Sequence, residues 1–476
     1  MRYPGFIGPS YTLDSVNIDS QRCVNWYPKF NEISTGKSGE QASLIATPGL
    51  SLLATIGTGP IRGSFVASNG FLYVVSGEKA FYVDKNYSTI FLGNLRTSTG
   101  QVDFADNGST LVIVDGDNGY WHTFSSFIIT RFTGSPWLGS KTVNFVDGYF
   151  LFSDPGTSKF YISSLNSVTL DALDFSFADG APDNIVATLV NHREVWLFGS
   201  DSIETWYNSG NADFPFQRIG GGFIEIGCAA PFSVAKINKT TLWIGRSKEG
   251  TGIIYAAQGL NPQRISTHAI EYAIQGYGDI SDASAWTYQE NGHFFYVLNF
   301  TNANTTWVYD LTTTLWSERA YFEGGNFKRH RASSHTFAYN KHTVGDFESG
   351  KIYELSSNNY TDNGEEIRRM RSAPHISSDL KRISYHSFQI DTEAGTGLIA
   401  DTQGNDPEMV LQFSDDGGHT WSNEKWAKLG KIGARSMRTI WRRLGASRDR
   451  VFRIFITDPI RTNLIGVEIE IEKLGS

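Results

Sequence analysis

Hydrophobic residues in this chain occur in short runs that are separated by polar turns, and the runs recur at a regular spacing. Each unit has an apolar strand, a turn rich in Asn, Asp or Gly, a second apolar strand and an aromatic third strand. The second strands read GFLYVVSG, STLVIVDG, GYFLFSD, REVWLFGS, TTLWIGR, GHFFYVLN and, more weakly, HTVGDF. Their spacing is roughly 40 to 50 residues, the length of one blade of a β-propeller.

The repeat predicts a propeller because a lone sheet of three or four strands cannot bury both of its faces. Sheets that are arranged radially about an axis cover one another. The first hairpins turn at SNG, DNGS, VDG and ENG, and such dipeptides favour the tight turns that hairpins require. We count six clear units and a seventh weaker one, which predicts six or seven blades. An irregular series of β-meanders is the alternative interpretation.

Two segments lie outside the repeat. The first, residues 1–55, has loop and short-strand character. In the second, from about residue 361, strands such as VFRIFITDP and GVEIEIE alternate apolar and polar positions, as half-buried antiparallel strands do. We therefore expect an all-β chain with an N-terminal arm or platform segment (1–55), a propeller (56–360) and a C-terminal β-sandwich-like platform domain (361–476).

Length and cysteine content agree with an intracellular multidomain protein. The chain has 476 residues, which suits two or three domains or one large repeat array. Cys23 and Cys228 lie far apart in the sequence, so we expect no disulfide framework and a reducing compartment. We find neither a signal peptide nor an apolar run long enough to span a bilayer.

Charge is distributed unevenly along the chain. The net charge of -8 argues against a basic nucleic-acid-binding protein. From Lys428 to Arg461, however, ten Lys and Arg face only two Asp. This segment is either a solvated face or a contact surface for an acidic partner. The candidate contact residues are Arg438, Arg442, Arg443, Arg448, Arg450 and Arg453.

Residues 414–421, SDDGGHTW, fit the pattern Ser-x-Asp-x-Gly-x-Thr-Trp and resemble the Asp-box of sialidases and other propeller proteins. The fixed positions of this pattern are Ser414, Asp416, Gly418, Thr420 and Trp421. We expect Asp416 to accept hydrogen bonds from turn amides, Gly418 to adopt a conformation that other residues avoid, and Trp421 to pack under the turn.

Catalytic chemistry finds little support in the sequence. A sialidase would need several such boxes, an Arg cluster, a Tyr nucleophile and an acidic carboxylate, and we find one box outside the repeat. We interpret His330 and His335 as surface-loop residues and not as a metal pair. Residues Glu365–Arg371 read as a solvated strand. We therefore predict no enzymatic activity, no cofactor and no metal site.

Three stretches, taken in order, resemble a known family. They are QRCVNWYPKFNE with LIATPGLSLLATIGTGPIRG, the aromatic LYVVSG blade, and SDDGGHTWS followed by LGKIGARSMRTIWRRLGASRDRVFRIFITDP. This pattern resembles the tail hub, or nozzle, of short-tailed bacteriophages, also called the packaged-DNA stabilisation protein. The resemblance covers nearly the whole chain and is strongest over the last 70 residues or so.

The resemblance implies a ring, typically of six copies, below the portal and its adaptor in the virion tail, assembled in the host cytoplasm. Such a ring extends the DNA channel, retains the packaged genome and helps its ejection. Double-stranded DNA would pass without sequence-specific binding. Tailspikes or fibres, and in some phages a tail needle or plug, would attach nearby. Candidate needle-binding loops are residues 208–222 and 318–331. A propeller glycosidase and a glycan-binding tail adhesin are the alternatives.

Overall fold

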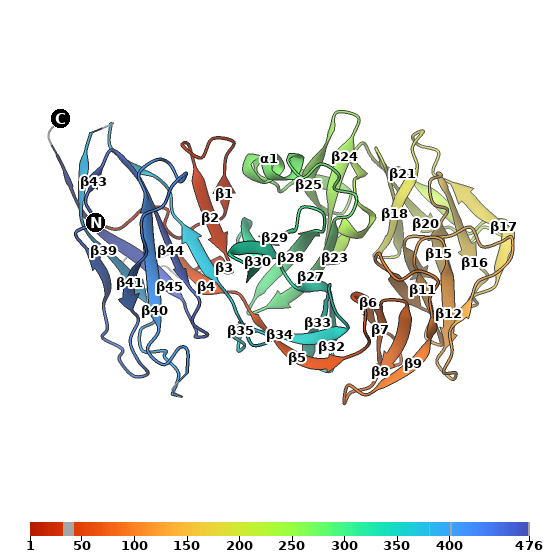
Figure 1. Ribbon diagram of the computed structural model, residues 1–476. Coiled ribbons are helices and arrows are strands. Elements are labelled where there is room, and N and C mark those ends of the chain that lie inside the picture. The colour runs from red at the N-terminus through yellow and green to blue at the C-terminus, as the bar shows by residue number, and fades with distance from the viewer. Residues whose placement is uncertain (32–41, 380, 400–401, 475–476) are drawn as a thin grey trace.

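The computed structural model describes residues 1–31, 42–379, 381–399 and 402–474 and shows an elongated all-β molecule (Figure 1). Within these residues, seven blades surround one axis as a propeller, and two sheets, one of them continuous with the sixth blade, pack face to face as a sandwich. The predicted fold class is therefore confirmed, and the blade number is seven.

Four consecutive antiparallel strands form each of the first four blades, with the first strand of each nearest the axis. These strands are β6 (Ile61–Val66), β7 (Leu72–Ser76), β8 (Lys79–Val83), β9 (Thr89–Asn94), β10 (Asp103–Asp106), β11 (Thr110–Val114), β12 (Gly119–Thr123), β13 (Thr130–Arg131), β14 (Val143–Val146), β15 (Tyr149–Ser153), β16 (Lys159–Ser163), β17 (Leu170–Phe177), β18 (Ile185–Asn191), β19 (Glu194–Gly199), β20 (Ile203–Asn208) and β21 (Phe216–Ile224).

The last three blades carry additional short elements. Their strands are β22 (Gly227–Cys228), β23 (Ala235–Ile237), β24 (Thr240–Ser247), β25 (Gly250–Gln258), β26 (Asn261–Arg264), β27 (Ser284–Glu290), β28 (His293–Phe300), β29 (Thr305–Asp310), β30 (Leu315–Glu323), β31 (Asn326–Arg329), β32 (Ala332–Ala338), β33 (Lys341–Asp346), β34 (Lys351–Ser356), β35 (Thr361–Asp362) and β36 (Glu365–Glu366). The 3₁₀ helix η1 (Pro231–Ser233) lies within the fifth blade, and the helix α1 (His268–Gln275) follows it.

The second strand of each blade shows why the sequence repeat predicted this fold. All five residues of β7 are buried, and β19 has a run of five buried residues. Both faces of these strands are covered because a neighbouring blade packs on each side. The hairpin turns follow the expected chemistry as well. Asp147 and Gly148 have φ values of 49° and 92°, the left-handed conformations that a tight hairpin turn requires.

A strand from the N-terminal segment closes the propeller ring. β5 (Gly49–Thr55) pairs antiparallel with β34 and supplies the fourth strand of the seventh blade. β35 then pairs with the other edge of β5. Both stretches cross the expected boundaries, because residues 49–55 and 361–366 belong to the seventh propeller sheet. Pairing the two ends of the repeat in one sheet leaves no open first or last blade.

The sandwich combines both ends of the chain. Its two sheets contain β1 (Tyr11–Thr12), β2 (Ser20–Val24), β37 (Arg369–Ser372), β38 (Ile376–Ser377), β40 (Glu408–Ser414), β41 (Lys425–Lys428) and β44 (Asp449–Ile456) in the first, and β3 (Trp26–Phe30), β4 (Ala42–Ala46), β39 (Ile383–Thr392), β42 (Thr439–Arg442), β43 (Ala446–Ser447) and β45 (Leu464–Lys473) in the second. Trp26, Phe388 and Phe452 lie in the core between them.

One continuous sheet joins the two domains. β2 pairs in parallel with β30 of the sixth blade through Val24 and Glu318, and pairs antiparallel with β37 on its other edge. The side chain of Asn25 reinforces this seam, since its Nδ2 donates to the carbonyls of Ala320 and Arg368 at 2.8 and 2.9 Å. The propeller and the sandwich are therefore connected by backbone pairing as well as by loops.

Three expectations about individual segments are wrong. Arg369 and Arg371 are fully buried, so the stretch Glu365–Arg371 is not a solvated strand throughout. His330 is also buried, and His335 lies half-buried on β32 with its Nε2 3.0 Å from His342 Nδ1, so neither is a surface-loop residue. The hairpin of β30 and β31 lies against the sandwich, where Phe327 packs on its strands, so it does not form a free tip for a tail needle.

Candidate functional surfaces

The Asp-box forms the hairpin turn after β40. Ser414 Oγ donates to Asp416 Oδ1 at 2.6 Å, and the Gly418 amide donates to Ser414 Oγ at 2.8 Å. Thr420 donates to Asp416 through its amide at 2.9 Å and through its hydroxyl at 2.5 Å. Gly418 has a φ of 107°, outside the range that other residues readily adopt. These contacts fasten the two ends of the turn.

The electrostatics of the box match this structural role. The hydroxyls of Ser414 and Thr420 and the Thr420 amide hold the pKa of Asp416 well below its ordinary value, because they donate to the ionised carboxylate. The Trp421 ring lies beside Gly418, and the Arg453 guanidinium lies over this ring, 3.8 Å from the ring centroid. Trp421 therefore joins the hairpin to β44.

The six predicted contact arginines differ in how far they are exposed. Arg438, Arg442, Arg443 and Arg448 are exposed on the sandwich. Arg453 is half-buried, and its Nη2 donates to Gln412 Oε1 at 2.6 Å. Arg450 is the exception, because only 2% of the residue is exposed.

Arg450 is a buried structural residue, so it does not present its charge to a partner as predicted. Its Nε and Nη2 bind the two carboxylate oxygens of Asp415 at 2.6 and 2.7 Å, and its Nη1 donates to the Leu444 carbonyl at 2.6 Å. The guanidinium also lies 4.0 Å from the centroid of the Phe413 ring. Asp415 precedes the fixed Asp of the box, so Arg450 anchors the Asp-box hairpin to the sandwich from within.

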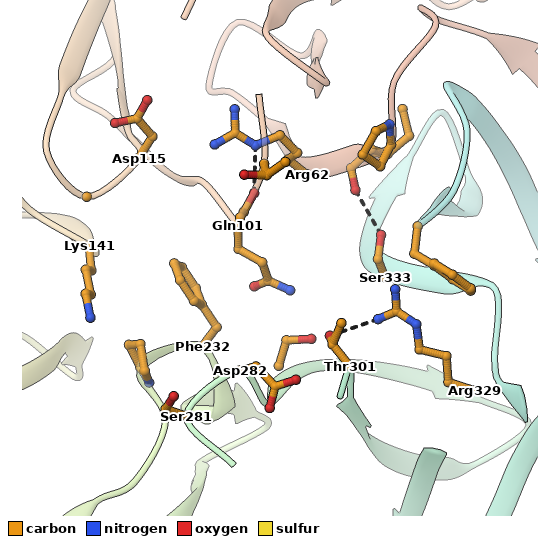
Figure 2. Close-up of a pocket in the computed structure, with 18 residues that line it drawn as sticks. Arg62, Gln101, Asp115, Lys141, Phe232, Ser281, Asp282, Thr301, Arg329 and Ser333 are labelled. Carbon is orange, nitrogen blue, oxygen red and sulfur yellow. Dashed lines mark hydrogen bonds between the residues drawn. The ribbon is translucent and has the colours of Figure 1, made fainter. Parts of the chain in front are cut away.

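A cavity of about 430 Å³ opens at the propeller axis, and residues from six blades line it (Figure 2). Its charged side chains are Arg62, Asp115, Lys141, Asp282 and Arg329. A second cavity of about 280 Å³ continues along the axis and shares Arg62, Gln101, Phe232 and Ser333 with the first. The two cavities mark the centre of the ring of blades.

Most of these charged groups bind the backbone that surrounds them. Arg62 Nη1 donates to the carbonyls of Gly77 and Thr97 at 3.0 and 2.7 Å. Its Nε donates to the Gly100 carbonyl at 2.6 Å. Asp282 accepts from the Asn302 amide at 2.6 Å. Figure 2 shows the Arg329 guanidinium directed at Thr301, to whose hydroxyl it donates at 3.0 Å. These contacts fasten loops within the sixth blade and at the end of the first, and none of them pairs a nucleophile with a base.

Sequence reasoning missed a buried His–Asp pair in the sixth blade. His293 Nδ1 lies 2.6 Å from Asp310 Oδ2, and Thr313 donates to the same oxygen at 2.9 Å. The Thr312 amide donates to Asp310 Oδ1 at 2.9 Å. Such a pair can be catalytic when its second ring nitrogen faces a nucleophile. Here the bonds of Asp310 run to its own turn, which indicates a clasp between β28 and β29.

Three further features bear on the predicted chemistry. Cys23 and Cys228 are free, buried thiols, and burial raises the pKa of each to about 12. The described residues contain no group of three or more His, Cys, Asp or Glu side chains arranged to hold a metal ion. Among the same residues, no helix has the length and apolar character needed to span a bilayer.

Comparison with protein families places both domains. A family model described as the β-propeller of bacteriophage P22 Gp10 matches residues 19–360. A second model, the β-sandwich of bacteriophage P22 Gp10, matches residues 368–472. The chain belongs to the P22 Gp10 family. This is the packaged-DNA stabilisation protein family of short-tailed phages, so the predicted resemblance is confirmed.

Two solved structures show a weaker likeness to this chain. The extracellular domain of a one-component system from B. thetaiotaomicron is 11% identical, with a TM-score of 0.44 over 82% of this chain and 48% of that one. The chain thus spans about half the length of that structure. The propeller domain of Cps50 from Myceliophteria thermophila is 9% identical, with a TM-score of 0.41 over 64% of this chain and all of that one. No curated protein matches the chain.

Proposed function

We propose that the chain is a tail hub that forms a ring, typically of six copies, below the portal and adaptor of a short-tailed phage. The ring extends the DNA channel, retains the packaged genome and helps its ejection. The single observation that carries this proposal is the match of both domains, in order, to the P22 Gp10 family. The family supports a structural tail role, and the ring and its neighbours are our extension of it.

The charge of the propeller suits a conduit for DNA. Residues 56–360 contain 28 Asp and Glu against 20 Lys and Arg, so this region carries the whole net charge of -8. A domain with net negative charge repels phosphates overall, which would let a duplex slide without sequence-specific contacts. The tail tip would also carry tailspikes or fibres, and in some phages a needle.

The sandwich is the domain that we propose to seat the hub on the adaptor ring. Arg438, Arg442, Arg443 and Arg448 are exposed there and can meet acidic groups of a partner. The sandwich is fastened to the propeller by the shared sheet, so a contact on one domain positions the other. The Asp-box, which raised the glycosidase and adhesin alternatives, holds a turn within this domain and favours neither of them.

DNA-filled heads of the parent phage that lack this protein would test the proposal. Purified chain is added, genome leakage is followed by nuclease sensitivity, and the tail vertex is imaged by electron microscopy. We expect retained DNA and a six-fold ring below the adaptor. Continued leakage without a bound ring, from protein shown to be folded, would contradict the hub function.

The arginines are tested in the same assay. The double variant Arg442→Ala with Arg443→Ala is expected to bind heads more weakly, because two exposed charges at the adaptor contact are lost. The matched control is Lys85→Ala with Lys248→Ala, which removes two exposed charges from the propeller. Equal binding of both double variants would show that these arginines do not contact the adaptor.

A further inference from the structure

A cluster of three arginines occupies the outer face of the sheet that joins the domains. Arg22 on β2 lies opposite Ser372 on β37, and Ser372 lies opposite Arg453 on β44. Residues paired across adjacent strands project from the same face of a sheet. Arg368 precedes β37 and reaches the same face, where its guanidinium lies 3.9 Å from the centroid of the Phe455 ring. We name Arg22, Arg368 and Arg453 the arginine corner.

Aromatic rings hold all three guanidinium groups in place. Arg453 lies over Trp421 of the Asp-box hairpin, and Arg368 lies between Phe455 and Phe322, at 4.5 Å from the latter. Arg22 lies 5.4 Å from the centroid of Phe327 on the β30–β31 hairpin. The corner is thus bordered by two hairpins, one from each domain. Stacking fixes the guanidinium planes but supplies no opposite charge.

The positive charge of the corner is poorly compensated. Arg22 pairs with Glu318, whereas no described carboxylate lies within ion-pair distance of Arg368 or Arg453. Their Nε atoms are buried without a hydrogen-bond partner, as is the hydroxyl of Ser372 between Arg22 and Arg453. Burial, followed by repulsion from Arg368 and Arg22, lowers the pKa of Arg453 to about 10. Crowded and desolvated like charges disfavour the isolated fold.

We propose that the arginine corner is a docking site for an acidic polypeptide segment of the adaptor ring, whose Asp or Glu carboxylates bind Arg368 and Arg453. This inference rests on the proposed function and adds residues to its contact surface. Planar guanidinium groups bind carboxylates through parallel hydrogen bonds, and the Nη atoms of Arg368 and Nη1 of Arg453, unlike the buried Nε atoms, remain accessible for such pairs. A bound carboxylate would also relieve the repulsion among the three arginines.

The setting favours carboxylates over duplex DNA. DNA backbones are bound by rows of protruding Lys and Arg, which release counterions along an extended track. Arg368 and Arg453 are instead half-buried between aromatic rings. Glu366 and Glu424 lie close enough to act on the charge of Arg368, so the local charge is mixed and differs from the continuous positive track that binds DNA. A partner that supplies a few carboxylates suits this mixed charge better than a phosphate backbone does.

The test compares the double variant Arg368→Gln with Arg453→Gln against wild-type protein in two measurements. The first is the affinity for a fluorescein-labelled dodecapeptide of alternating Glu and Ser, with a labelled 12-base-pair duplex beside it. The second is the melting temperature of the free protein. The matched control is Lys85→Gln with Lys248→Gln, which removes the same charge from exposed propeller positions. If the double variant does not fold, Arg453→Gln replaces it.

We expect peptide affinity to fall about tenfold or more in the double variant and to change little in the control. The melting temperature should stay the same or rise, because a repulsive cluster is removed. On DNA-filled heads, the double variant should fail to bind where wild-type protein binds. Together these results would distinguish a docking site from a structural support.

Four outcomes would overturn the inference. A fall in melting temperature with unchanged peptide affinity would make the arginines structural supports. Loss of duplex binding in place of peptide binding would make the corner a DNA contact, and a changed sedimentation coefficient of the free protein would make it a contact between copies. Normal binding of the double variant to heads would also reject the site, and the proposed hub function would then still stand on the wild-type result.

Discussion

Neighbouring arginines of one segment serve different purposes in this molecule. Arg448 is exposed, whereas Arg450 two residues later is buried and binds Asp415 with two parallel hydrogen bonds. Arg448 precedes β44, whereas Arg450 lies on that strand, where the rings of Tyr385 and Phe413 cover its guanidinium. A charge count along the sequence gives the same weight to both residues, but only the exposed one can meet a partner.

Replacement of Arg450 should therefore destabilise the sandwich. Arg450→Ala is expected to lower the free energy of unfolding by about 2–4 kcal/mol, because it removes stacking and buried hydrogen bonds. The ion pair itself contributes a discounted share, since the side chain of Asp415 is 44% exposed. Urea denaturation measures the change, and Arg448→Ala, expected within about 0.5 kcal/mol of wild type, is the control. Equal effects of the two variants would contradict the structural role.

The Asp-box gives a pH-dependent prediction. The pKa of Asp416 is depressed in the folded protein, so its contribution to stability is present above the unfolded value of about 3.9 and is lost as the pH falls below it. Asp416→Asn should lower the melting temperature at pH 7, and its difference from wild type should shrink below about pH 4. A difference that does not depend on pH would exclude the carboxylate as its cause.

At the scale of elements, β5 decides whether the propeller is a closed ring. This strand lies more than 270 residues from its partner, with Leu50 opposite Leu355. Leu50 is buried in the cluster between the sixth and seventh blades, while Leu52 on the same strand is 48% exposed. Closure therefore depends on the buried Leu50 end of β5, because Leu52, two residues further along the same face, is exposed.

The two leucines of β5 form a matched pair for a test of closure. Leu50→Ala is expected to cost about 2–4 kcal/mol through lost burial and a residual cavity, and Leu52→Ala under about 1 kcal/mol. Hydrogen exchange should show faster opening of β34 and β6 in the first variant, because the seventh blade would separate first. Unchanged protection of β34 in Leu50→Ala would show that ring closure does not depend on this strand.

At the scale of the whole molecule, the shared sheet makes the two domains dependent on each other. Asn25 lies at this seam with a φ of 56°, is buried, and binds Ala320 and Arg368 across three strands. A rigid seam would suit the proposed position of the hub between an adaptor and a tail tip, because a load on one domain would be transmitted directly to the other.

Removal of the Asn25 side chain should loosen this seam. Asn25→Ala is expected to lower the free energy of unfolding by about 2–4 kcal/mol and to separate the sandwich and propeller transitions in calorimetry. Asn166→Ala is the control, because Asn166 has a similar φ of 52° but is exposed. It should reproduce only the backbone strain of about 1 kcal/mol. A single unchanged transition in Asn25→Ala would argue against coupling through this residue.

The sequence by itself determined the repeat and the local chemistry of its turns. Blade strands such as β7 are buried on both faces, so they appear as short apolar runs, and turn pairs such as Asp147 and Gly148 carry a conformational preference of their own. The hydrogen bonds of the Asp-box could also be predicted from the sequence, because they join residues no more than four positions apart. Interactions between residues that are close in the chain can be recognised from the sequence alone.

Only the tertiary structure decided what depends on pairing between distant segments. The addition of β5 to the seventh blade, the shared sheet through β2, the pair of His293 and Asp310, and the arginine corner each join residues that are separated along the chain. The burial of Arg450 and Arg369 belongs to the same class. A side chain is buried or exposed according to which strands pack over it. That packing cannot be read from the order of residues in a single sequence.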